Sequence, residues 1–256
     1  MRFVRTGSGS DGVLAGRRRK NHPDRETRPP LLSKEGSFFM IPRIKICCIA
    51  NEQEAADAIS FRASAIGLVG EMPSGPGPIS DEEILRIART VPPPIATFLL
   101  TSEQTARGIV DHHHRTETNT IQIVDELEGR DYSAIRAALR GVKLVQVIHV
   151  IGEQSVVEAA EIAEFVDAIL LDSGNPHLTV KELGGTGRRH DWSLSRRIVE
   201  TCGKPVFLAG GLNAGNVREA IEAVQPFGLD LCSGVRTDGK LDLEKLAQFF
   251  ASIERV

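Results

Sequence analysis

Short apolar runs alternate with longer amphipathic segments from residue 41 onward. Eight of these runs have the length and the aliphatic, β-branched content of buried strands: 43–49, 64–70, 94–100, 120–124, 143–150, 166–172, 205–210 and 228–234. The segments between them repeat apolar residues every three or four positions, which predicts helices, for example at 81–90, 153–165 and 214–224. Strands that are apolar on both faces and separated by helices indicate parallel pairing through right-handed crossovers.

Eight strand–helix units favour a (β/α)8 barrel over an open doubly wound sheet, which more often ends at five or six strands. No GxGxxG motif follows the first strand, so a dinucleotide-binding fold lacks its main sequence support. The length of 256 residues and the 41% hydrophobic content suit one such core. We therefore predict an α/β protein with a single (β/α)8 TIM barrel over residues 41–256.

Residues 1–40 have no apolar period and are rich in Gly, Pro, Ser and charged residues, which predicts a disordered extension. The only apolar stretch there, GVLAG, is interrupted and precedes the basic run RRRK, so no secretory signal is indicated. The basic run is best interpreted as part of a solvated tail, with an address signal or a phosphate-seeking arm as alternatives. Met40 stands just before the first strand and is an alternative start.

The formal net charge of −3 combines a basic tail with an acidic barrel, because residues 1–39 hold nine Lys/Arg against four Asp/Glu. An acidic barrel disfavours a nucleic-acid partner. No apolar run reaches the roughly 18 residues of a membrane span, which predicts no membrane partner. Four cysteines without a secretory signal indicate reduced thiols and a cytoplasmic protein.

The topology of a barrel indicates where to look for chemistry, because active sites of this fold lie at the C-terminal ends of the strands. Cys47 and Cys48 end the first strand and Asp172 ends the sixth. Glycine-rich turns follow the seventh and eighth strands, and a third lies in the long loop after the sixth. All of these features are expected on one face of the barrel.

The glycine-rich turns after strands seven and eight predict a phosphate site at Gly210, Gly211, Ser233 and Gly234. Turns without side chains let backbone N–H groups converge on an anion, and these two loops commonly bind phosphate in this fold. The alternative is a tight turn before a helix cap at Asn213. We favour phosphate because the two turns follow adjacent strands.

Asp172 closes an apolar strand, so its carboxyl group is expected in a partly desolvated mouth that suits a general acid. An Asx-type turn or helix cap in the sequence DSGNP explains the same residue equally well.

The adjacent thiols Cys47 and Cys48 can be simple packing or chemistry. A bond between them would close a strained eight-membered ring and is discounted. Strand eight neighbours strand one in a closed barrel, so Cys232 can approach one of them. No CxxC pair or matching histidine set is present, so no metal is predicted, and the histidines at 112–114 are expected to cap a helix at the surface.

Four ordered motifs resemble the phosphoribosylanthranilate isomerase family over nearly all of residues 41–256. RIKICCIANEQEA resembles the family's opening, whose usual first strand reads K-I-C-G-I-T. AILLDSGNPHLTVKELGGTGRRHDWS resembles strand six with its G-G-[ST]-G loop and following D-W. VFLAGGLNAGNVREAI and PFGLDLCSGVRTDGKLDLEKLAQF resemble strands seven and eight.

The resemblance implies an aldose–ketose isomerase of tryptophan biosynthesis that performs an Amadori rearrangement. It implies Cys47 as the general base, Asp172 as the general acid and Asp230 as a supporting residue. The strand-six loop, with Gly185, Gly187 and Arg188, then contacts the substrate. No cofactor and no metal are expected, and the expected partner is a small phosphorylated substrate bound by a monomer or homodimer.

The chain departs from the family at several positions: Cys48 for glycine, Ala50 for threonine, Val124 for histidine and Asp125 for glycine. Gly77 stands where the family's S-x-R-[YF]-[IV]-S motif places the arginine that pairs with the anthranilate carboxylate. Such a pair contributes on the order of a hundredfold to binding.

Three interpretations follow. The chain is a phosphoribosylanthranilate isomerase that anchors the carboxylate through Arg188, Arg189 or Arg236, a paralogue for another phosphorylated sugar derivative, or a retired phosphate-binding barrel. Retention of both Cys47 and Asp172 disfavours the third.

Overall fold

The computed structural model of the chain describes residues 42–185 and 187–254. The extension predicted to be disordered, residues 1–40, lies outside the described residues. No helix among the described residues is long and apolar enough to cross a membrane.

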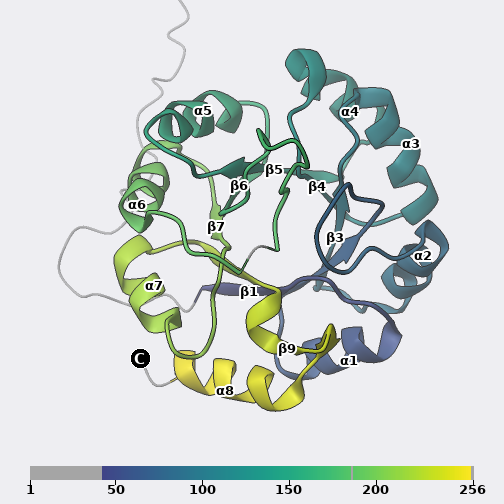
Figure 1. The fold of residues 1–256 in the computed structure, drawn as a ribbon. Helices are drawn as coiled ribbons and strands as arrows, with labels where there is room; N and C mark the ends of the chain where they lie inside the picture. Colours follow the sequence, from purple (N-terminus) through teal and green to yellow (C-terminus); the bar gives the residue numbers. More distant parts are fainter. Residues whose placement is uncertain (1–41, 186, 255–256) are drawn as a thin grey trace, which may run out of the picture. The chain divides into compact units, whose positions relative to one another are not determined.

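The described residues form a closed barrel of parallel strands, which confirms the predicted fold (Figure 1). Each strand pairs with the next along the chain, and β8 pairs with β1 in the register Arg43↔Gly228 to Ile46↔Leu231. All eight predicted strands are present: β1 Arg43–Ile46, β2 Ala65–Val69, β3 Ala96–Thr101, β4 Thr120–Ile123, β5 Lys143–His149, β6 Ala168–Asp172, β7 Val206–Leu208 and β8 Gly228–Leu231.

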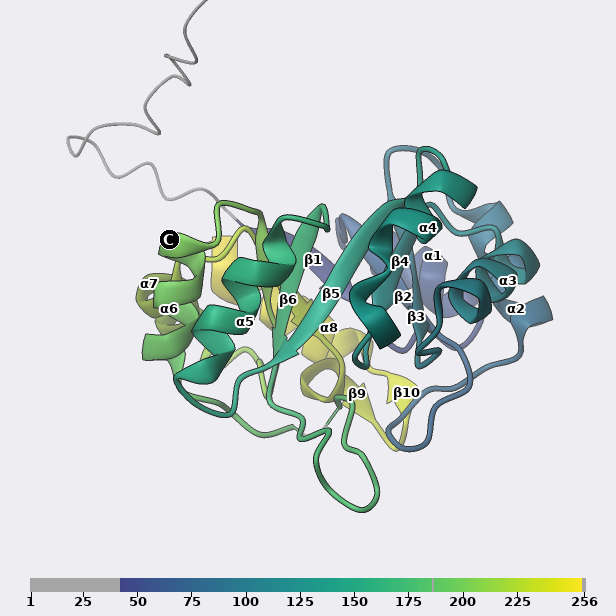
Figure 2. The same ribbon diagram turned by 90° about the horizontal axis from the view of Figure 1, so that it is seen from above.

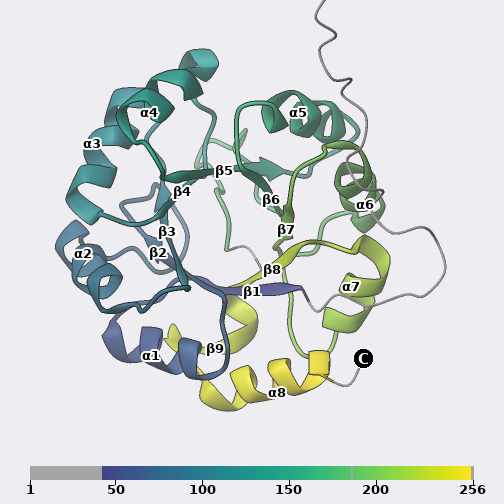
Figure 3. The same cartoon turned by 180° about the vertical axis from the view of Figure 1, so that it is seen from behind.

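A ring of helices surrounds the barrel (Figure 3). They are α1 Glu52–Ser60, α2 Asp81–Thr90, α3 Ala106–Thr116, α4 Tyr132–Ala138, α5 Gln154–Ala163, α6 Trp192–Thr201, α7 Val217–Val224 and α8 Leu243–Glu254. Several begin at a polar side chain that accepts a hydrogen bond from the first turn, as Asn51, Ser80 and Thr105 do. Short elements complete the described chain: 3-10 turns η1 Glu128–Arg130 and η2 Ser233–Val235, and the hairpin of β9 Arg236–Thr237 with β10 Lys240–Leu241.

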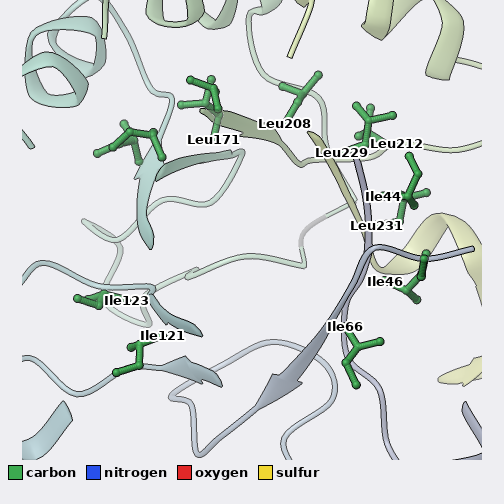
Figure 4. Close-up of a cluster of buried hydrophobic side chains, with 14 of the residues drawn as sticks. Ile44, Ile46, Ile66, Ile121, Ile123, Leu171, Leu208, Leu212, Leu229 and Leu231 are labelled. Carbon is green, nitrogen blue, oxygen red and sulfur yellow. The ribbon is translucent and has the colours of Figure 1, made fainter. Parts of the chain in front are cut away.

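Alternate residues of each strand serve two different cores. Ile44 and Ile46 of β1 pack toward the helices with aliphatic residues of the other strands (Figure 4). Cys47 belongs to the smaller cluster that fills the barrel interior, together with Phe98 and Leu170. Each fully buried Ile or Leu contributes about 1.5–3 kcal/mol. The outer core therefore holds the helices on the barrel, and the inner positions near the C-terminal ends are left for chemistry.

Seen from the side, the β9–β10 hairpin and the long loop before α6 lie at the same end of the barrel (Figure 2). This is the end at which the parallel strands finish, where the candidate residues were predicted to meet.

The prediction of a surface histidine cap at 112–114 is wrong for two of the three residues. His112 and His113 lie within α3 and are only 4% and 8% exposed. The His112 ring bridges Thr101 and Asp81, with its nitrogens 2.8 Å from Thr101 Oγ1 and 3.0 Å from Asp81 Oδ1. These histidines are buried because α3 extends two residues beyond the tract and turns this part of its surface toward the barrel.

Candidate active site

A cavity opens at the C-terminal ends of the strands. It brings together most of the candidate residues from β1, β6, β7 and β8 and from the loops that follow them: Cys47, Asp172, Gly185, Gly187, Gly210, Gly211, Asp230 and Ser233. Among the predicted site residues, Gly234 and Arg188 do not line it.

Lys45, which the sequence analysis did not single out, lies beneath Cys47 and is completely buried. Its Nζ donates a hydrogen bond to Asp230 Oδ1 at 2.9 Å, because Lys45 and Asp230 are register partners on β1 and β8. The Phe98 ring centroid is 5.2 Å from the same Nζ. Asp230 is therefore the counter-charge of a buried lysine.

Gly67 on β2 provides the space that Lys45 and Cys47 share. A Cβ added at Gly67 would lie 2.9 Å from Cys47 Sγ and 3.0 Å from Lys45 Nζ, so these two atoms are less than about 6 Å apart. An ammonium group at this distance stabilises a thiolate.

The charges around Cys47 favour its thiolate. A hydrogen bond from Cys48 and the positive charge of Lys45 lower the pKa of Cys47, and together they outweigh the effect of burial. Burial alone lowers the pKa of Lys45, but the attraction of Asp230 and Cys47 is larger and raises that pKa above its ordinary value, so Lys45 stays charged. These surroundings suit Cys47 to accept a proton.

Asp172, the last residue of β6, is 8% exposed and faces the cavity. Its Oδ1 accepts a hydrogen bond from the Gly174 N–H at 2.9 Å, which is the Asx-type contact considered from the sequence. Gly184 approaches from above, and a Cβ there would lie 3.5 Å from Asp172 Oδ2. The carboxyl group is therefore held by its own loop and still faces the cavity. Asp172 can form the Asx-type turn and also serve as a site residue.

Three glycine-rich loops converge beside Asp172. A Cβ at Gly211 would lie 2.7 Å from the Gly187 carbonyl oxygen, and one at Gly187 would lie 3.5 Å from Ser233 Oγ. Gly234 packs so tightly on Leu212 that a Cβ would overlap the Leu212 carbonyl oxygen. The first N–H groups of a helical turn have no intrahelical acceptor, and η2 begins at Ser233. These loops form a cradle suited to a phosphate group.

The loop after β2 covers the mouth from the other side. Ser74 Oγ donates a hydrogen bond to the Lys181 carbonyl oxygen at 2.5 Å, which links this loop to the one before α6. Gly77 has φ +85° and lies against Cys48, where a Cβ would be 2.6 Å from the Cys48 Cβ. The position of the family arginine is therefore one that excludes any side chain in this loop conformation.

The arginines of the strand-six loop form ion pairs outside the cavity. Arg188 pairs with Glu182, and Arg189 lies 3.2 Å from Glu219. Among the described residues that line the cavity, none is an arginine or a lysine.

Arg236, the third predicted carboxylate anchor, is buried and bound within the fold, so that prediction is wrong. Its guanidinium forms an ion pair with Glu54 at 2.9 Å and donates hydrogen bonds to the carbonyl oxygens of Cys47 and Cys48. Glu54 also accepts from the Leu241 N–H at 2.9 Å. Arg236 instead fixes the backbone that presents the two cysteines, because its position after η2 turns it toward α1.

Residues 44–252 match the family model described as N-(5'-phosphoribosyl)anthranilate (PRA) isomerase. The chain belongs to the phosphoribosylanthranilate isomerase family. The N-(5'-phosphoribosyl)anthranilate isomerase of Methanosarcina acetivorans is 33% identical over 224 residues, covering 82% of this chain and 92% of the relative.

Solved structures of the family show the same barrel. One phosphoribosyl anthranilate isomerase, crystallised with reduced 1-(o-carboxyphenylamino)-1-deoxyribulose 5-phosphate, has a TM-score of 0.68 at 28% identity and covers 84% of this chain and 100% of its own. Monomers generated from the dimeric enzyme of Thermotoga maritima have a TM-score of 0.67 at 26% identity, with the same coverage. The predicted family, barrel and isomerase class are confirmed.

Proposed function

We propose that this chain catalyses the Amadori rearrangement of N-(5'-phosphoribosyl)anthranilate, with Cys47 as the general base and Asp172 as the general acid. The observation that supports this assignment most directly is the placement of a thiol with a lowered pKa and a buried carboxyl group in one cavity beside a phosphate cradle. The family model and the similar relatives are phosphoribosylanthranilate isomerases, which agrees with the function predicted from the sequence.

The reaction needs one proton delivered and one removed. Asp172 protonates the furanose ring oxygen, the ring opens to a Schiff base, and Cys47 removes the proton from C2 of the sugar. The enolamine then tautomerises to the ketose. The ends of β1 and β6 lie on different sides of the barrel mouth, so the two groups address different atoms of one substrate (Figure 1).

Lys45 is proposed to position this chemistry without contacting the sugar. Its charge stabilises the Cys47 thiolate before the reaction, and its ion pair with Asp230 holds that charge inside the barrel. The loops at Gly187, Gly211 and Ser233 hold the 5'-phosphate, which fixes the sugar relative to the two proton-transfer groups.

The test is turnover of phosphoribosylanthranilate, generated in situ and followed by fluorescence, for the full-length protein and for Cys47→Ala and Asp172→Asn. Each variant should lose at least about a thousandfold in kcat while binding a phosphate ester nearly as before. Cys202→Ala, at the end of α6 and outside the cavity, is the matched control. Comparable turnover by either site variant would remove that residue from the mechanism.

Gly77 favours one alternative, a substrate that is a phosphorylated sugar derivative without the anthranilate carboxylate. No basic side chain among the described residues lines the cavity to pair with that group. Binding of a phosphate ester without turnover of phosphoribosylanthranilate would favour this alternative or a barrel that has lost catalysis. We further propose a cytoplasmic monomer or homodimer with a small phosphorylated substrate and no nucleic-acid or membrane partner.

A further inference from the structure

Two thiols meet at the seam where the barrel closes. Cys48 follows β1 and Cys232 follows β8, and their Sγ atoms are 2.8 Å apart although 184 residues separate them in the sequence. The seam is held by the β1–β8 register and by the hydrogen bond from the Cys47 N–H to the Leu231 carbonyl oxygen at 2.7 Å. The pair is therefore positioned by the closure of the barrel.

The backbone at Cys48 makes this contact possible. Consecutive residues of an extended strand point to opposite sides, yet Cys47 and Cys48 both line the cavity. Cys48 has φ +62°, a left-handed conformation that non-glycine residues rarely adopt. A cysteine thus occupies a position that suits glycine, and its thiol points at a second thiol.

We propose that Cys48 and Cys232 are a redox-active dithiol that forms a reversible intramolecular disulfide between the ends of β1 and β8. A disulfide has an S–S distance of about 2.05 Å, so the two sulfur atoms need to approach by less than about 1 Å. Both side chains line the open cavity, which gives a small oxidant access to them.

The oxidant is a low-molecular-weight disulfide, R–S–S–R. Cys232, the more exposed of the two, attacks one sulfur, forms a mixed disulfide and releases the first R–S⁻, which takes the Cys232 proton. Cys48 then attacks the Cys232 sulfur and releases the second R–S⁻, which takes the Cys48 proton. Two protein thiols are oxidised to one disulfide, and one R–S–S–R is reduced to two R–SH.

The other cysteines are poorer partners. A Cys47–Cys48 bond would close a strained eight-membered ring. Cys202 ends α6, a helix that returns to the start of β7 at the opposite end of the barrel, and its Sγ contacts the Lys204 carbonyl oxygen at 3.5 Å. The new bond would tie the residue after the proposed base to the residue before Ser233 of the phosphate cradle.

The test uses the full-length protein, reduced and then treated with oxidised glutathione, with free thiols alkylated before mass spectrometry. The expected result is loss of two of the four free thiols, a mass about 2 Da lower before alkylation, and a peptide linking Cys48 to Cys232. The cross-link should raise Tm by roughly 5 °C or more, and dithiothreitol should reverse the change.

Matched variants separate this pair from the other cysteines. Cys48→Ser and Cys232→Ser should each prevent the cross-link, while Cys202→Ser and Cys47→Ser should retain it. Four thiols that stay free, a link that includes Cys47, or only glutathione adducts would each overturn the proposal. These readouts do not depend on turnover, so a failure of the isomerase assignment would leave the result interpretable.

Discussion

Gly77 and Cys48 pack against each other at the cavity mouth, with room for only one side chain between them: a Cβ on Gly77 would lie 2.6 Å from the Cys48 Cβ. At these two positions the motif resemblance leads one to expect a glycine and an arginine, and this chain has Cys48 and Gly77. The packing of the two positions is therefore coupled in this structure.

This coupling predicts that Gly77→Arg alone will not restore a carboxylate anchor. The positive φ of Gly77 and the contact with Cys48 should lower the free energy of unfolding by about 2–4 kcal/mol. In the double variant with Cys48→Gly, the cost should be smaller than the sum of the single changes by at least about 1 kcal/mol. Urea denaturation of the four proteins measures this cycle, and strict additivity would show that the two positions are independent.

Lys45→Met should affect both stability and the pH–rate profile. It leaves Asp230 buried without its counter-charge, which costs about 3–5 kcal/mol. It also removes the positive charge that lowers the pKa of Cys47, so the basic group seen in kcat/KM should titrate at higher pH. The pH dependence of kcat/KM, measured at a temperature where the variant is folded, checks the second effect.

The control for Lys45→Met is the double variant Lys45→Met with Asp230→Asn. Removing the unpaired charge should recover part of the lost stability. It should also reverse part of the shift in the profile, because the negative charge of Asp230 raises the pKa of Cys47. An unchanged profile in Lys45→Met would mean that Lys45 serves the fold alone.

Gly67→Ala should disturb the base directly. The added methyl group would meet Cys47 Sγ and Lys45 Nζ at 2.9 and 3.0 Å, and we expect a loss of about 1–3 kcal/mol in stability and at least about tenfold in kcat. Gly152→Ala is the matched change, because its nearest neighbour is the flexible Gln154 side chain. Equal effects of the two substitutions would contradict a special role for the space at Gly67.

The buried histidines predict a loss of stability in mild acid. Burial lowers the pKa of His112 and His113 below the ordinary value of 6.5, so the unfolded chain binds more protons as the pH falls through 6.5. The free energy of unfolding should therefore decrease as the pH falls below about 6.5, and it should decrease less in His113→Gln. Denaturation at pH 7.5 and 5.5 measures the difference, with His114→Gln as the exposed control.

The barrel was predictable because each strand is a separate apolar run that needs no knowledge of its partners. The end of β1 was less predictable. The apolar run continues to Ile49, but β1 stops at Ile46 and Cys48 adopts a left-handed φ. Apolar content does not report backbone handedness. The burial of His112 was missed for a similar reason, since it depends on which face of α3 meets the barrel.

The base and the acid were found through motif resemblance and the rule that places chemistry at the strand ends, and their roles remain proposals. One sequence feature pointed to Lys45: it lies two positions before Cys47 in a mostly apolar strand, and therefore on the same face of that strand. Its pairing with Asp230 depends on the register between the first and last strands, which no local pattern contains. The contacts of Arg236 were equally unpredictable, because they depend on where the two-residue strand β9 directs its side chain.

The ion pair of Lys45 and Asp230 joins residues separated by 185 positions. Its formation therefore depends on the order in which the chain is synthesised. When the ribosome has released β1 but not β8, Lys45 has no counter-charge and cannot be buried at acceptable cost. The proposed base therefore acquires its electrostatic surroundings only when the last strand is in place. A chain that stops short of residue 230 would lack the final piece of the barrel wall and the partner of Lys45 together.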